Sequence, residues 1–122
     1  MQYKNDSDLV QISFFQNTNK ETLFQGVLGS YDDEPTFSII VAGLLGEEAA
    51  QFMFHLTNDF ESAIRQYSIH INPRDMDKFS KSPYRGIPMS VGDLVEVDNY
   101  YDLHSFLCLP MGWQELKKEP IL

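Results

Sequence analysis

The sequence predicts an α+β fold, a mostly antiparallel, curved sheet with one main helix packed on one face. Its 122 residues suit a single domain, residues 1–122, built around one modest core. Residues 37–43 (FSIIVAG) are apolar on both faces and rich in β-branched side chains, which is typical of a central strand covered by a helix. Residues 46–57 then change to helical spacing, and residues 94–109 alternate as the two strands of a hairpin do.

The N-terminal third predicts extended structure interrupted by turns. Residues 9–15 (LVQISFF) mix β-branched and aromatic side chains and predict the first strand. Residues 23–31 (LFQGVLGSY) are a second candidate strand, which Gly26 and Gly29 weaken. Residues 30–36 (SYDDEPT) predict a loop, because this composition interrupts any regular ladder.

The main helix is predicted by its charge and by its spacing. Glu47 and Glu48 fall in the first turn, where the helix dipole favours negative charge. The apolar side chains recur at i, i+3, i+4 and i+7, at Ala49, Phe52, Met53 and Leu56.

The segments after the main helix are less regular. Residues 60–67 predict a second short helix, or a kinked continuation of the first, capped by Asp59. Residues 68–73 suggest a short extended piece. Residues 73–88 (PRDMDKFSKSPYRGIP) contain three prolines and little periodicity, so we expect a surface loop there.

A tight turn is expected at Ser90-Val91-Gly92-Asp93, directly before the hairpin. Gly92 is free to take positive φ, and Asp93 is expected to accept backbone hydrogen bonds that close the turn, and to pair with Arg85. This turn would set the register of the hairpin. Asp98-Asn99 is a hairpin turn signal, and residues 113–116 (WQEL) predict a short last strand.

The chain is strongly acidic, with 18 acidic and 9 basic residues and a net charge of −9. Such a protein is a poor candidate for nucleic acid, because phosphates are bound by Lys and Arg. A protein partner with a basic surface is expected instead. The alternative is that the acidity only keeps a small protein in solution. The acidic residues proposed to contact the partner are Asp32, Asp33, Glu34, Glu47 and Glu48.

The charge is also unevenly distributed. Residues 65–85 hold five basic and two acidic residues, a local charge of +3, so the rest of the chain carries −12. The sequence therefore predicts a dipolar molecule, with one basic loop on an acidic body.

The spacing of the potentially catalytic residues matches no known active-site or metal-site pattern. Cys108 and His104 lie on one face of a predicted strand but about 13 Å apart at roughly 3.3 Å per residue, too far for a nucleophile pair. The histidines and the cysteine match no compact zinc pattern. The chain has none of the glycine-rich nucleotide motifs and no G-x-S-x-G. We expect no catalytic residue, no metal and no cofactor, and therefore not an enzyme.

Cellular location is predicted from three features. No apolar run reaches the roughly 18 to 20 residues that span a bilayer, and the polar N-terminus has no signal-peptide core. The single cysteine, Cys108, fits a reducing compartment. We expect a cytoplasmic protein without a membrane segment; the oligomeric state stays open.

The predicted hairpin and its flank are rich in aromatic residues, which are favoured at protein interfaces. A small domain also needs aromatic residues for its own core. Tyr100, beside the hairpin turn, is the best candidate for exposure. Tyr100 and Trp113 are the aromatic residues proposed to contact a partner.

The C-terminal half, RGIPMSVGDLVEVDNYYDLHSFLCLPMGWQEL, resembles a signature of YodL-type domains and their relatives, small proteins often carried by plasmids and phages. The helix GEEAAQFMFHLTND is similar to the acidic, Phe-containing helix of those proteins. The chain departs from the pattern at Asn99, where the pattern has Gly, and before Gly112, where this sequence has additional residues. The matching positions are Arg85, Ser90, Val91, Gly92, Asp93, Val95, Tyr101, Gly112 and Trp113.

The resemblance implies a mobile-element context and an α+β domain, and it implies no catalytic activity. Together with the charge, it leads to the hypothesis of a non-enzymatic inhibitor that binds a host nucleic-acid-handling defence protein, such as a CRISPR nuclease. The alternative is a regulatory or scaffolding module in plasmid or phage maintenance, which binds through its aromatic hairpin.

Overall fold

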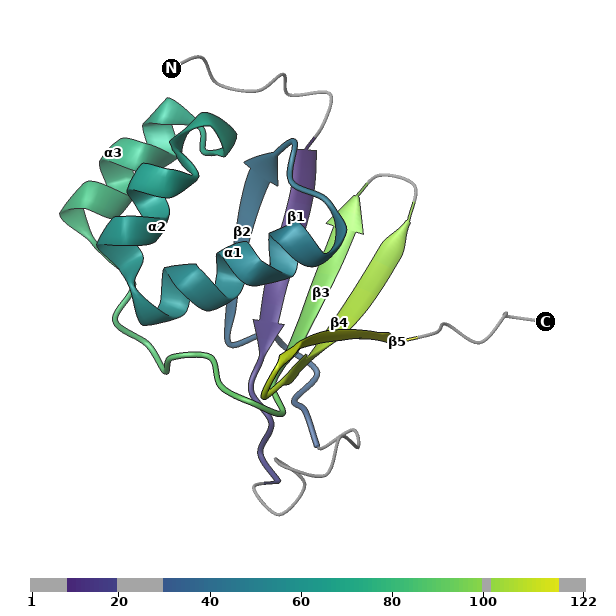
Figure 1. Cartoon of the computed structure of the whole chain (residues 1–122). Helices are drawn as coiled ribbons and strands as arrows, with labels where there is room; N and C mark the ends of the chain where they lie inside the picture. Colours follow the sequence, from purple (N-terminus) through teal and green to yellow (C-terminus); the bar gives the residue numbers. More distant parts are fainter. Residues whose placement is uncertain (1–8, 20–29, 100–101, 117–122) are drawn as a thin grey trace.

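Five strands form one open antiparallel sheet in the order β2-β1-β3-β4-β5 (Figure 1). The computed structural model describes residues 9–19, 30–99 and 102–116. The α+β prediction is confirmed. The strands are β1 (Leu9–Phe15), β2 (Phe37–Ala42), β3 (Leu94–Asn99), β4 (Leu103–Leu109) and β5 (Gly112–Leu116).

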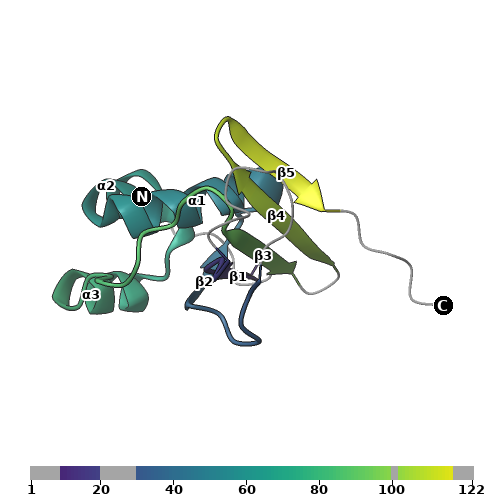
Figure 2. The ribbon, with the colours of Figure 1, turned by 90° about the horizontal axis from the view of Figure 1, so that it is seen from below.

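The helices are α1 (Gly46–Asn58), α2 (Phe60–Gln66), a short 3-10 helix η3 (Ser68–His70) and α3 (Pro73–Lys81). Figure 2 shows α1 and α2 on one side of the sheet and α3 beyond the β2 edge. No helix in the described part of the chain is long and apolar enough to cross a bilayer.

The core lies between the sheet and α1. Val10, Ile12 and Phe14 alternate along β1, so all three point to one face of the sheet, where they are buried. Register carries this row across the sheet, because Ile12 is opposite Ile39 on β2 and Val97 on β3. The face of α1 that meets the sheet includes Phe52, Met53 and Leu56, all fully buried, as its spacing predicts.

Residues 37–43 form a strand as predicted, but its position is not central. β2 lies at the edge of the sheet, and β1 takes a central place between β2 and β3. The two-sided apolar pattern has another origin. Ile39 faces the core, whereas Ile40 faces outward and is 52% exposed.

The expected surface loop over residues 73–88 is wrong in its first half, where α3 forms. Pro73 stands at the start of the helix, where its missing N–H costs nothing, and the Asn72 side chain accepts a hydrogen bond from the Arg74 N–H (2.9 Å). Met76 and Phe79, three apart, pack against the core. The basic segment is therefore a helix rather than a loop.

The predicted Asp59 cap is confirmed, whereas the predicted extended piece at residues 68–73 is wrong. Asp59 caps α2, because its carboxylate accepts from the Ser62 N–H (3.3 Å), as expected. Residues 68–70 form the 3-10 helix η3 in place of an extended piece. The candidate strand at residues 23–31 lies largely outside the described residues.

Candidate protein-binding site

The Ser90–Asp93 turn has the geometry that the sequence predicts. Gly92 has φ of 93°, in the left-handed region that favours glycine. The Asp93 N–H donates to the Ser90 carbonyl (3.1 Å), which closes the turn. The Gly92 N–H donates to the Cys108 carbonyl (2.8 Å), and the Cys108 N–H donates to the Asp93 carbonyl (2.9 Å). The turn therefore fixes where β3 meets the end of β4.

The Asp93 side chain is buried, at 2% exposure, and accepts two backbone hydrogen bonds. The Ser90 N–H donates to Oδ2 and the Asn17 N–H donates to Oδ1, both at 2.8 Å. Burial raises the pKa of this carboxyl above its ordinary value, and the hydrogen bonds from Asn17 and Ser90 oppose that rise. The expected pairing with Arg85 is wrong: Arg85 is exposed and takes part in no ion pair of the described residues.

Asp93 therefore has a structural role, of which the sequence predicts the bonds within the turn but not the bond to Asn17. Its bond to Asn17 joins positions 76 residues apart. Tyr31 adds a second link from the same connection, because its hydroxyl donates to the Gly92 carbonyl (2.6 Å). The Ser90–Asp93 turn is therefore attached to the β1–β2 connection through Asn17 and Tyr31.

The candidate catalytic and metal-binding side chains lie apart from one another, and two of the histidines have structural partners. His104 Nδ1 lies 2.7 Å from Glu115 on the neighbouring strand. His70 Nδ1 lies 2.8 Å from the Ala42 carbonyl, which can only accept, so Nδ1 carries the proton. Among residues 9–19, 30–99 and 102–116, no three possible metal ligands come together.

Cys108 is 4% exposed, and burial, with the Asp93 charge, raises the pKa of its thiol to about 11. The thiolate is the reactive form, so only about one molecule in a thousand would carry it at pH 8. We expect iodoacetamide to label the native protein at pH 8 at least 100-fold more slowly than the urea-unfolded protein, about as the thiolate fraction predicts. Mass spectrometry measures both rates. Equal rates would show that the thiol is accessible and ionised.

The proposed acidic contacts form two separate clusters. Asp32, Asp33 and Glu34 are exposed just before β2, and Glu47 and Glu48 are exposed at the start of α1, just after it. The six residues of β2 lie between them and span about 20 Å at roughly 3.3 Å per residue. The structure does not bring these acids together.

Of the two aromatic residues proposed to contact a partner, the structure describes only Trp113. Tyr100 lies outside the described residues. Trp113 is half-buried: its Nε1–H donates to Gln51 Oε1 (3.1 Å), and its ring packs edge-on against Phe54 at 6.3 Å between centroids. Trp113 therefore attaches β5 to α1, which leaves only part of its ring for a partner.

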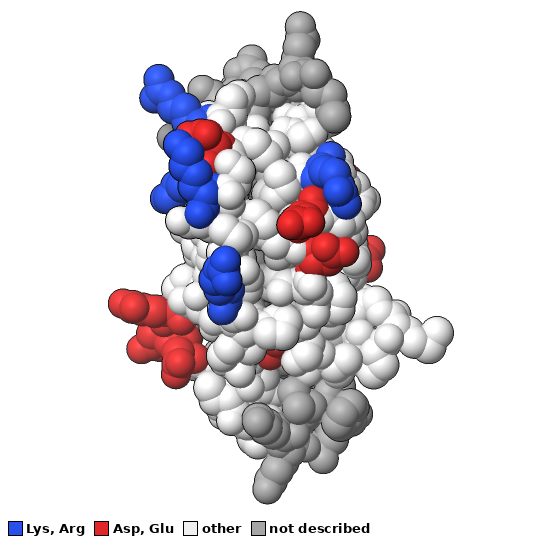
Figure 3. All heavy atoms as spheres, turned by 90° about the vertical axis from the view of Figure 1, so that its left-hand side faces the viewer, with Lys and Arg blue, Asp and Glu red and all other residues white. Residues whose placement is uncertain are grey.

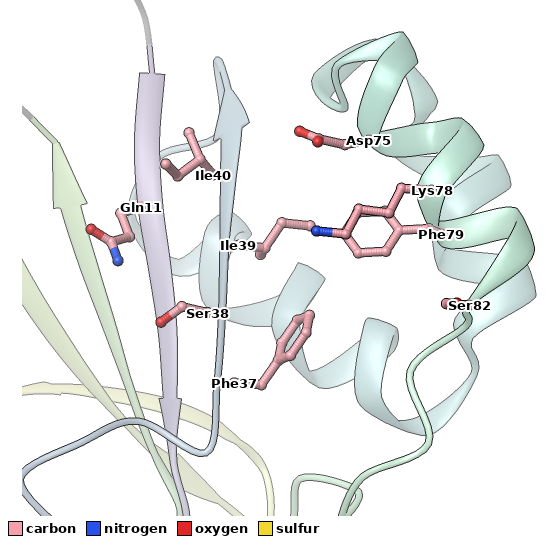
Figure 4. Close-up of a pocket in the computed structure, with 9 residues that line it drawn as sticks. All are labelled: Gln11, Phe37, Ser38, Ile39, Ile40, Asp75, Lys78, Phe79 and Ser82. Carbon is pink, nitrogen blue, oxygen red and sulfur yellow. The ribbon is translucent and has the colours of Figure 1, made fainter.

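A groove that the sequence does not predict lies between the free edge of β2 and α3 (Figure 4). Its volume is about 470 Å³, within the usual range for binding pockets. Residues of β1 and β2 form one side, and residues of α3 and its C-cap form the other. The lining residues are Gln11, Phe37, Ser38, Ile39, Ile40, Asp75, Lys78, Phe79 and Ser82.

The groove combines an apolar centre with charges from α3. Phe79 and Lys78 extend toward Ile39, and Asp75 lies higher, on the side of Ile40 (Figure 4). Lys78 is exposed and takes part in neither ion pair of the described residues, whereas Lys81 pairs with Asp77 at 3.1 Å. The groove therefore offers an available ammonium group above an apolar surface.

The segment that contains α3 is basic in an otherwise acidic chain. Figure 3 shows Lys and Arg side chains on the upper and middle parts of this face, with acidic side chains among them, and a separate acidic cluster that projects below. Basic and acidic side chains therefore alternate over much of this face, so the predicted separation of charge stays a prediction.

No family model, curated protein or solved structure matches this chain. The resemblance to YodL-type domains therefore stays a prediction.

Proposed function

We propose that this chain is a non-enzymatic binding protein of a phage or mobile element, which inhibits a host nucleic-acid-handling defence protein by protein–protein contact. A CRISPR nuclease is the sharpest version of such a target. The proposal places the protein in the host cytoplasm. The partner surface is basic, as nucleic-acid-handling surfaces are.

The observation that carries the proposal is the exposed cluster Asp32-Asp33-Glu34, whose carboxylates form no ion pair among the described residues. The chain on both sides of it is tied down. Tyr31 donates to the Gly92 carbonyl before the cluster, and the Thr36 N–H donates to the Phe14 carbonyl (2.7 Å) after it. A cluster held in this way loses less conformational entropy on binding than a free loop would.

The test begins with affinity capture from host lysate and mass spectrometry, followed by binding measurements on the captured protein. Replacing the cluster by Asp32→Asn, Asp33→Asn and Glu34→Gln is expected to weaken binding about tenfold, because three partly screened charge contacts are lost. Raising the salt from about 0.05 M to about 0.5 M should weaken wild-type binding as well, because the Debye length shortens.

A matched variant removes three exposed acids elsewhere, by Glu61→Gln, Asp98→Asn and Asp102→Asn. It should retain most of the affinity, whereas a general charge effect would weaken both variants equally. A second arm, Glu47→Gln with Glu48→Gln, tests the separate cluster on α1. A partner that holds the wild type and the first triple variant equally tightly, at every salt concentration, contradicts the proposal.

A further inference from the structure

The outer edge of β2 is a second candidate site, independent of the proposed function. No described strand pairs with this edge, because β2 is the first strand in the order and β1 covers only its inner side. An edge strand presents a row of backbone N–H and C=O groups that can pair with another chain. The upper end is already occupied, since His70 binds the Ala42 carbonyl. The available stretch is therefore Phe37–Ile40.

This same stretch forms one wall of the groove of about 470 Å³. Edge strands are usually short, charged, bulged or covered, which prevents unwanted pairing. Here α3 stands across from the edge and leaves the space between them open (Figure 4). A groove between a free strand edge and a helix is the arrangement in which an extended peptide adds one strand to a sheet.

The side chains determine which peptide would fit. Successive residues of an added strand point to opposite faces of the sheet. On the helix side they meet Ile39 and Phe79, and on the open side they meet Ser38 and Ile40. Apolar side chains suit the first set, and small or polar ones suit the second. Lys78 reaches into the middle of the groove, where its ammonium group would pair with a carboxylate of the peptide.

We propose that the β2–α3 groove binds an extended segment of a partner protein as a sixth strand of the sheet, with alternating apolar side chains and a central acidic residue that pairs with Lys78. The +3 charge of residues 65–85 favours the approach of such a segment. This acidic segment is distinct from the basic surface that the Asp32–Glu34 cluster would contact, so either site can exist without the other.

The probe is a phage-displayed library of random nine-residue peptides, selected against the full chain. Selected peptides should share an alternating apolar pattern with one fixed Asp or Glu. Lys78→Glu should weaken their binding about tenfold or more, since an attraction becomes a repulsion. Arg74→Glu makes the same charge change on α3 outside the groove and should alter affinity less than about threefold. A peptide whose acid is replaced by Lys should regain affinity for the Lys78→Glu variant.

Two measurements separate strand addition from other binding modes. Methylating alternate backbone nitrogens of the peptide removes its strand hydrogen bonds and should abolish binding. Amide protons within Ser38–Ile40 should exchange more slowly with deuterium when the unmethylated peptide is bound. Binding with unchanged exchange at Ser38–Ile40 overturns the proposal.

Two further outcomes also count against the proposal. A library that yields no binder would show that α3 and Lys78 only guard the edge against pairing. Light scattering that detects a dimer, which Ile40→Lys dissociates, would make a second copy of the chain the occupant. Lys78→Glu and Arg74→Glu are both exposed substitutions, and equal thermal midpoints for the two variants confirm that folding is intact.

Discussion

Replacing Asp93 by alanine is expected to lower the free energy of unfolding by about 3 kcal/mol, because one buried and one partly buried N–H group lose a charged acceptor. The bonds lost are those from Ser90 and Asn17, each 2.8 Å long. Urea unfolding followed by circular dichroism measures the loss. Asp98→Ala makes the same chemical change at an exposed position of β3 and is expected to stay within about 0.5 kcal/mol of the wild type.

Asp93→Asn is expected to fall between the wild type and Asp93→Ala. Its amide oxygen can accept one of the two bonds, while its amide nitrogen meets a donor at the other. Equal stability of Asp93→Ala and the wild type would show that water satisfies both N–H groups, and that the carboxylate does not hold the β1–β2 connection.

The pH dependence of this site follows from the same burial. The pKa of Asp93 is raised in the folded state, mainly because burial disfavours the charge, so the folded state binds this proton more tightly than the unfolded state does. The resulting stability is complete below the unfolded pKa and is lost as the pH rises through the folded pKa. The stability difference between wild type and Asp93→Asn is therefore expected to be larger near about pH 4 than near about pH 7.

Phe52→Ala is expected to cost about 4 kcal/mol, because it removes a fully buried ring and leaves a cavity. Phe52 has 0% exposure and packs edge-on against Tyr67, with 4.8 Å between ring centroids. It joins α1 to the segment that leads into η3 and α3. Because a domain of this size is stabilised by only about 5–15 kcal/mol, the variant would have a large unfolded population at modest urea concentrations.

Phe54→Ala is the matched control, since it removes the same ring from the same helix at a half-buried position. Its cost is expected to be about 1–2 kcal/mol, because less surface is lost from the core. The fluorescence of Trp113 and the far-UV circular dichroism should report one common transition for both variants. Equal losses for Phe52→Ala and Phe54→Ala would mean that the core is not centred where α1 meets the sheet.

Local patterns predicted the elements whose signals lie within a few residues. The strand at residues 9–15, the helix from Gly46 and the positive φ of Gly92 each follow from spacing or from one special residue. The start of α3 was also readable, since Asn72-Pro73 is a helix-start signal. Residues 73–88 were nevertheless predicted as a loop, because they are polar, contain two later prolines and have a single apolar pair at helical spacing, Met76 and Phe79.

Non-local features could not be predicted in the same way. The two-sided apolar character of residues 37–43 is equally compatible with a central strand and with an edge strand beside a groove. The Asn17–Asp93 bond joins segments 76 residues apart, and Ile39 and Phe79, which are 40 residues apart, line the same groove. No periodicity encodes such pairs. The candidate groove exists only because the chain crosses from β2 through α1 and α2 to α3.

The position of β1 has a consequence for how the chain is made. β1 is the first described strand, yet one of its neighbours, β3, begins only at Leu94. On the ribosome, β1 can pair with β2 early, but its other edge stays open until β3 has emerged. Until then β1 and β2 each have one edge that no described strand covers, and β3 closes only the edge on β1. Folding of the sheet is therefore expected to wait for residues 94–99, with β3 insertion as the step that protects β1 from other chains.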